Sequence, residues 1–205
     1  MAKRIRAGDL RRRPWRREPL RRFLVVCEGR LTEPEYFKAL RRRYRASVKL
    51  VIEPGGVSPE RLVERAVDMK RAAERDARRQ RDRFLRYEEV WCVFDTDKHD
   101  HLADAHRQAE ENGIDLAVSN PCFELWALLH FQEQTGFLES QAARARLKKH
   151  LPEYEKTLPF ERLDPNYATA VTRARELDRR CGDDGSPGVN PSTGVYRLTE
   201  RIRER

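Results

Sequence analysis

The 205-residue sequence contains no apolar run approaching the ~20 residues that a membrane-spanning helix requires. Its basic N-terminus also lacks the apolar segment of a secretory signal, so we expect a cytoplasmic protein with no membrane partner. Hydrophobic residues make up 39% and charged residues 38% of the chain, which indicates a soluble protein with a heavily charged surface. The length suits one domain with a real core, or a domain with a small appendage.

Cysteine is scarce, and its four positions give neither a Cys-x-x-Cys pair nor a disulfide framework. Cys27, Cys92 and Cys122 lie among apolar residues, whereas Cys181 stands alone. We therefore expect reduced and mostly buried thiols.

The net charge of +9 is concentrated at one end of the chain. Residues 1–22 hold ten Lys or Arg against two acids, which leaves the remaining 183 residues at about +1. This tail contains two prolines and is expected to be disordered when free. Its expected partner is the phosphate backbone of nucleic acid, and a solubilising or subunit-contacting arm is the alternative. The candidate contacts, in which the tryptophan would stack on an unpaired base, are Arg11, Arg12, Arg13, Trp15, Arg16 and Arg17.

The stretch 90–97 has the pattern of a buried strand that ends in two carboxylates. Side chains alternate along an extended chain, so Asp95 and Asp97 point the same way and Thr96 points away. Like charges that close favour a shared hard cation such as Mg²⁺. The alternative is that both acids only cap the following turn.

A second apolar run, 23–27, ends in Glu28 and Gly29. Doubly wound α/β sheets place their chemistry beyond the carboxyl ends of the strands, so Glu28 meets the Asp pair if the two strands are neighbours. Gly29 allows a sharp turn after the acid.

The body alternates strands and helices, which predicts an α/β fold with a mainly parallel four-stranded sheet covered on both faces. Helix 33–45 is expected to begin with a capping box of Thr32 and Glu35, and the charged region 70–86 is expected to project into solvent. The predicted strands are 23–27, 47–53, 90–94 and 114–118, and the predicted helices are 33–45, one from residue 58 and 102–112.

The segment 119–131 is expected to form the most hydrophobic helix, with Asn120 as its cap and Pro121 at its first position. Glu124 lies in its first turn, where two interpretations are equally open: favourable interaction with the helix dipole, or an active-site role. His130 is expected to be a core histidine.

The last third is less informative. Helices are predicted at about 139–151, 165–181 and 193–203, and Asp183 and Asp184 are expected in a loop as turn residues. The expected organisation is a tail (1–22), a core (23–135) and a helical C-terminal extension packed on the core (136–205).

Glu-Gly after one strand and Asp-x-Asp after a later one resemble the Toprim domain of topoisomerases, bacterial primases and OLD-family nucleases. Three segments, 26–37, 94–99 and 119–131, also resemble the RloB-like family of Toprim-related proteins from abortive-infection and restriction-linked loci. The resemblance implies a Toprim-like Rossmannoid core, a role in phage defence and often an ATPase encoded by a neighbouring gene. It also implies that Glu28 matches the Toprim acid, Asp95 and Asp97 the metal-binding pair, and Glu124 the acid of the Asn-Pro-x-Phe-Glu-x-Trp segment.

The chemistry expected from these residues is hydrolysis of a phosphodiester in DNA or RNA, possibly tRNA. Asp95 and Asp97 would hold Mg²⁺ or Mn²⁺, and Glu28 would complete the metal shell or move a proton. Arg30, Lys98 or a histidine from 99–101 would stabilise the developing negative charge. No tyrosine is placed like a topoisomerase nucleophile, so water is the expected attacking group. The alternative is a non-catalytic subunit that binds nucleic acid or an ATPase. The sequence does not indicate an oligomeric state.

Overall fold

The computed structural model describes residues 21–52, 57–96, 102–180 and 189–204. Its central sheet has the strand order β2-β1-β3-β4-β5, in which the first four strands are parallel and β5 is antiparallel to β4. The strands are β1 (Arg22–Cys27), β2 (Ser47–Ile52), β3 (Glu89–Asp95), β4 (Asp115–Asn120) and β5 (Ser192–Thr193). The predicted mainly parallel α/β sheet is confirmed, and the two-residue β5 is an addition that the sequence did not indicate.

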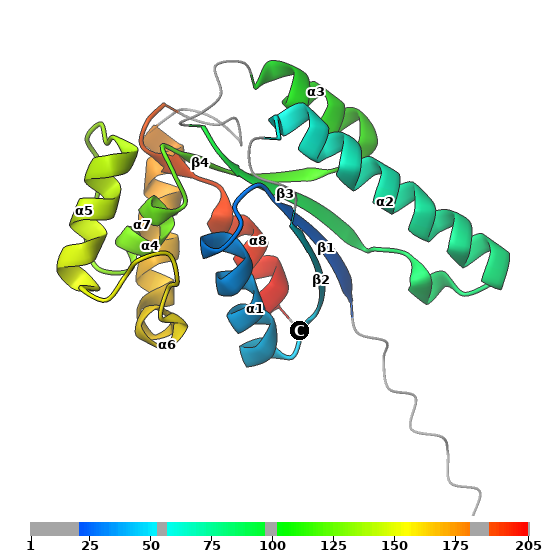
Figure 1. Ribbon diagram of the computed structural model, residues 1–205, viewed down its shortest axis with the longest axis horizontal. Helices are drawn as coiled ribbons and strands as arrows, with labels where there is room; N and C mark the ends of the chain where they lie inside the picture. The colour runs from blue at the N-terminus through cyan, green and yellow to red at the C-terminus, as the bar shows by residue number, and fades with distance from the viewer. Residues whose placement is uncertain (1–20, 53–56, 97–101, 181–188, 205) are drawn as a thin grey trace, which may run out of the picture.

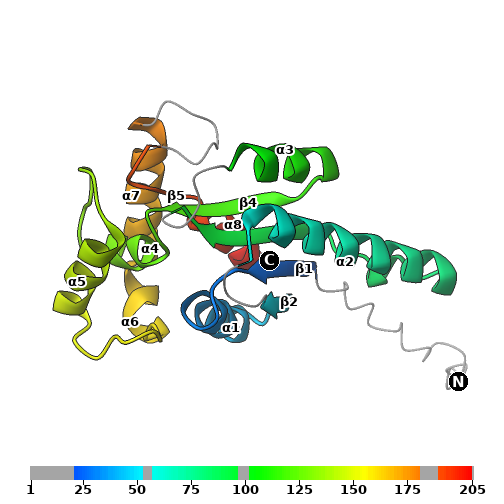
Figure 2. The same cartoon turned by 45° about the horizontal axis from the view of Figure 1, so that its top comes forward.

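Helices cover both faces of the sheet (Figures 1 and 2). One face is packed by α2 (Pro59–Gln80) and α3 (Ala103–Asn112), and the other by α1 (Thr32–Tyr44) and α8 (Val195–Arg203). Residues alternate between the two cores along β1: Val25 and Cys27 lie in the larger core, and Leu24 and Val26 lie in the smaller one. This period of two is the one that buries a parallel strand on both sides.

The remaining helices gather at one end of the sheet (Figure 1). Their hydrophobic side chains are continuous with the larger core, so the described residues of 136–205 share that core with the sheet and α1. They are α4 (Glu124–Leu129), α5 (Ser140–His150), α6 (Phe160–Leu163) and α7 (Tyr167–Arg180), with the short 3-10 helix η2 (Asp164–Asn166). A second 3-10 helix, η1 (Arg83–Leu85), follows α2 and contacts it.

Most element boundaries agree with the sequence pattern within a few residues, but two predicted caps are wrong. Thr32 does not cap α1, because its hydroxyl donates to the carbonyl oxygen of Lys156 instead. Pro121 does not open α4: Asn120 is the last residue of β4, the Asn120–Pro121 bond is cis, and the helix begins at Glu124. A local turn pattern was overridden in both cases by tertiary packing.

The second half of α2 extends past the sheet, as expected for its charged sequence (Figure 1). Apart from Ala77, its side chains beyond residue 70 are exposed or only partly buried. Among the described residues, no helix is both long enough and apolar enough to cross a bilayer.

Candidate functional site

Glu28 lies directly after β1, at the carboxyl-terminal edge of the sheet. Its backbone N–H donates to the carbonyl oxygen of Val93 at 3.0 Å, which extends the pairing of β1 with β3 by one residue. Its side chain is only 6% exposed. The register therefore carries this acid to the same edge as the end of β3.

Gly29 lies against the side chain of a second acid, Glu33. A Cβ atom added at Gly29 would overlap the carboxylate of Glu33, which is itself 6% exposed. Glu33 was not among the predicted site residues. Its place in the first turn of the helix that directly follows Glu28 and Gly29 was the signal that could have identified it.

Asp95 is the last residue of β3 and is partly buried. Along the strand it follows Trp91 and Val93, which face the larger core on the α1 side. Its predicted partner Asp97, together with Lys98 and the histidines of 99–101, lies outside the described residues, as does the Arg-rich and Trp15-containing segment 1–20.

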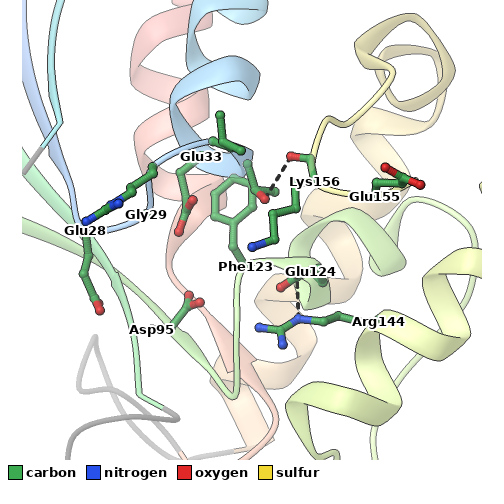
Figure 3. A pocket seen from close by; sticks show the side chains of 12 residues that line it. Glu28, Gly29, Glu33, Asp95, Phe123, Glu124, Arg144, Glu155 and Lys156 are labelled. Atoms are coloured by element: carbon green, nitrogen blue, oxygen red, sulfur yellow. Dashed lines mark hydrogen bonds and ion pairs between the residues drawn. The ribbon is translucent and has the colours of Figure 1, made fainter. Parts of the chain in front are cut away.

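Glu28, Glu33 and Asp95 share one pocket of about 490 Å³ (Figure 3). Figure 3 shows these three carboxylates on one side of the pocket and Glu124, paired with Arg144, on the other. The lining residues come from both halves of the chain: Glu28, Gly29, Arg30, Leu31, Thr32, Glu33, Asp95, Phe123, Glu124, Arg144, Glu155 and Lys156.

Glu124 is held by two donors from the C-terminal region. Its Oε1 accepts from Arg144 Nε at 3.0 Å and from the hydroxyl of Tyr154 at 2.8 Å. Burial alone would raise the pKa of Glu124, but hydrogen bonds from Cys122 and Tyr154 and the charge of Arg144 outweigh it, so the net pKa is lowered. The acid is therefore ionised in the fold, and its position is fixed by both charge and hydrogen bonding.

The sequence did not predict the side of the site that is built from Arg144, Tyr154 and Lys156, which is called the C-terminal wall below. Arg144 lies on α5, and Tyr154 and Lys156 lie in the loop that follows it. No spacing in the sequence connects these residues with Glu124, because the contacts form only when α5 packs against α4. The tertiary contact, rather than a local motif, brings them to the site.

The donors lining the pocket suit a hard cation by their chemistry. The acids supply carboxylate oxygens, and no Cys or His is among the described lining residues. Within residues 21–52, 57–96, 102–180 and 189–204, however, no three His, Cys, Asp or Glu side chains come close enough to form a metal site by themselves. The roles of Glu28, Asp95 and Asp97 as metal ligands, and of Glu28, Asp95, Asp97 and Glu124 in catalysis, stay predictions.

The remaining candidates are placed as follows. Arg30 is exposed and lines the pocket. His130 is a core residue as predicted, 3% exposed, with Nδ1 2.9 Å from the carbonyl oxygen of Trp126, and burial lowers its pKa to about 4. Cys27, Cys92 and Cys122 are buried free thiols, whereas Cys181, Asp183 and Asp184 lie outside the described residues.

Comparison with known families agrees with the sequence motifs. The family model described as RloB-like protein matches residues 23–202, a range that includes both the acidic edge and the C-terminal wall. Searches of curated proteins and of solved structures give no significant match. Since the family model covers most of the sequence, this chain belongs to the RloB-like family.

Proposed function

We propose that this RloB-like protein is a metal-dependent phosphodiesterase with a Toprim-like core, which cleaves DNA or RNA, tRNA included, in phage defence by abortive infection. The observation that supports the proposal most is the parallel pairing of β1 with β3. It brings Glu28 and Asp95, 67 positions apart in the sequence, into one pocket at the edge where open α/β sheets hold their active sites.

Mg²⁺ or Mn²⁺ is the cofactor that fits this edge. Glu28 and Asp95 would hold the ion, with Asp97 as a further ligand, and Mg²⁺ commonly needs no more than one or two carboxylates besides water and substrate phosphate. Bound there, the ion neutralises phosphate oxygens and lowers the pKa of a bound water.

The chain's own residues supply the remaining functions. Glu28 takes the proton from the attacking water or returns one to the leaving oxygen. Arg30 and Lys98 offset the negative charge that develops on the phosphoryl group. Glu124, ionised and fixed by Arg144 and Tyr154, holds the opposite wall of the pocket in place. The basic segment 1–20 adds sequence-independent affinity for the phosphate backbone.

The defence role and an ATPase partner are inferred from family membership. The reaction class is inferred independently, from the acids in the pocket. Evidence for strand cleavage would therefore support the reaction without establishing the biological role.

Asp95→Asn tests the reaction. Purified protein is incubated with DNA and with tRNA in Mg²⁺, in Mn²⁺ and in chelator, and we expect wild-type cleavage only with a metal. Asp95→Asn should reduce the rate by at least about 10³-fold, because it removes a carboxylate needed for metal-assisted charge stabilisation.

Asp104→Asn is the matched control, because Asp104 is an exposed acid on α3 that pairs with Arg107 outside the pocket. It should cleave at the wild-type rate. Undiminished cleavage by Asp95→Asn, or cleavage in chelator, would reject the assignment.

A non-catalytic nucleic-acid- or ATPase-binding subunit is the second candidate. It is favoured by the absence, within the described part of the chain, of three metal-ligand side chains that lie close together. This candidate predicts salt-dependent binding that Asp95→Asn does not alter, with no metal-dependent cleavage by the wild type.

A further inference from the structure

Lys156 places a positive charge in the acidic pocket from the far side. It is an exposed residue of the loop between α5 and α6, and it lines the same pocket as Glu28, Glu33 and Asp95. Figure 3 shows its ammonium group directed into the pocket, between those carboxylates and Glu124. The side chain belongs to the C-terminal region, which sequence reasoning left without a functional residue.

The backbone of this loop is fastened at two neighbouring points. The hydroxyl of Thr32 donates to the carbonyl oxygen of Lys156 at 3.0 Å, and the hydroxyl of Tyr154 donates to Glu124 at 2.8 Å. The first contact ties the loop to the beginning of α1, and the second ties it to the beginning of α4. Lys156 is thus held over the pocket by its backbone, whereas its side chain takes no part in either bond.

The side chain of Lys156 makes no ion pair within the described residues, although Glu124 and Glu155 line the same pocket. Arg144, the neighbouring cation, is instead paired with Glu124 at 3.0 Å. An ammonium group that is not neutralised by the protein is suited to an anionic ligand, and phosphate is the anion that the proposed reaction brings to this site.

We propose that Lys156 binds a phosphate next to the scissile one, so that the substrate is a polynucleotide strand rather than an isolated phosphodiester. This inference rests on the proposed function, in which Glu28 and Asp95 mark the position of the scissile phosphate. Arg30 lies in the loop after β1 and Lys156 in a loop of the C-terminal region, so the two cations approach the acids from different elements. A strand crossing the pocket would meet one cation on each side of the bond that breaks.

Two substrates that differ in length separate this role from a general one. Bis(p-nitrophenyl) phosphate carries a single phosphodiester, whereas a labelled single-stranded oligonucleotide carries neighbouring phosphates. With Mn²⁺, we expect Lys156→Gln to lower kcat/KM on the oligonucleotide by about tenfold, mainly through KM, because one charge-assisted contact is lost. Hydrolysis of the small diester should be unchanged.

Two further variants serve as controls. Lys156→Arg keeps the charge and should restore most of the activity on the oligonucleotide. Lys148→Gln removes an exposed lysine of α5 that does not line the pocket, and it should leave both substrates unaffected. Because Lys156 is tethered through its backbone carbonyl, Lys156→Gln retains the bond from Thr32 and the fold of the loop.

An equal loss on both substrates, or no loss on the oligonucleotide, would overturn the proposal for Lys156 while leaving the reaction established. If the wild type cleaves neither substrate, the proposed function fails, and Lys156 is tested by binding alone. In chelator, the slope of log affinity against log salt for the oligonucleotide should then fall by about 1 in Lys156→Gln and not in Lys148→Gln. An unchanged slope in Lys156→Gln would also overturn it.

Discussion

The two edges of the sheet hold pockets of similar size but different chemistry. At the amino-terminal edge lies a pocket of about 440 Å³. It is lined by Glu89, the first residue of β3, by Asp115, the first residue of β4, and by residues of α8. At the carboxyl-terminal edge, the pocket of about 490 Å³ is lined by Glu28, Glu33 and Asp95. Volume alone therefore does not distinguish the two pockets.

Glu89, at the amino-terminal edge, is matched by two arginines at short range. Glu89 accepts from Arg201 Nε at 2.9 Å, from Trp91 Nε1 at 3.0 Å and from Arg21. These bonds join the residue before β1, the start of β3 and α8, and so they hold these parts of the fold together. The carboxyl-terminal edge instead gathers acids from the end of β1, from α1, from β3 and from α4 around one pocket, where Arg144 pairs with Glu124.

Matched acid-to-amide substitutions at the two edges should separate activity from stability. We expect Glu28→Gln to reduce strand cleavage by about 10²-fold or more, because it removes a proton-transfer or metal-binding carboxylate. Glu89→Gln should cleave normally but unfold at lower urea concentration, with a loss of about 1–2 kcal/mol because its charge-assisted bonds are weakened. Cleavage assays and urea denaturation of both variants provide the comparison. If Glu89→Gln also loses cleavage while folded, the two edges do not have separate roles.

The two edges also differ in the direction of their pKa shifts. The pKa of Glu124 is lowered, so this acid stabilises the fold above its ordinary pKa, and the contribution is lost as the pH falls through the lowered value. The pKa of Asp115 is raised, first by partial burial and then by the charge of Glu89, so its ionised form opposes folding at neutral pH. Glu124→Gln should therefore destabilise the protein at pH 7, by about 1.5–3 kcal/mol, and Asp115→Asn should stabilise it slightly.

Urea denaturation between pH 7 and pH 3 checks these signs. Both differences from the wild type should shrink on acidification, because the wild-type carboxyl groups then become protonated like their neutral replacements. A destabilised Asp115→Asn at pH 7, or a Glu124→Gln gap that widens toward pH 3, would contradict the assignment. Lys148→Gln serves as a surface control with no expected change in pH dependence.

The sequence revealed the acidic edge because its signals are local. A buried strand that stops at a carboxylate predicts where that carboxylate lies, and α/β alternation predicts a parallel sheet that brings such ends together. Glu28 and Asp95 were found in this way. Neither required any knowledge of which helices pack against which.

The C-terminal wall of the pocket depends on contacts between distant segments, which no local pattern encodes. Thr32 illustrates the limit: its spacing from Glu35 matches a capping box, yet its hydroxyl bonds to the backbone of Lys156, 124 positions away. Arg144 and Tyr154 likewise acquire their partner only when α5 packs on α4. The four-residue α6 and the two-residue β5 were missed for a different reason, because elements this short leave no periodic signal.

Thr32→Val should give the smallest effect and still sharpen the comparison between the edges. The substitution keeps the shape of the side chain but removes the donor to Lys156, an exposed bond worth about 0.5–1 kcal/mol. Because the bond holds the loop that carries Lys156, we expect KM for the oligonucleotide to rise by about two- to fivefold with little change in kcat. In the double variant with Lys156→Gln, the effect of Thr32→Val should disappear, since the loop then has no ammonium group to position. Full additivity of the two changes in a double-mutant cycle would instead show that Thr32 acts on the pocket independently of Lys156.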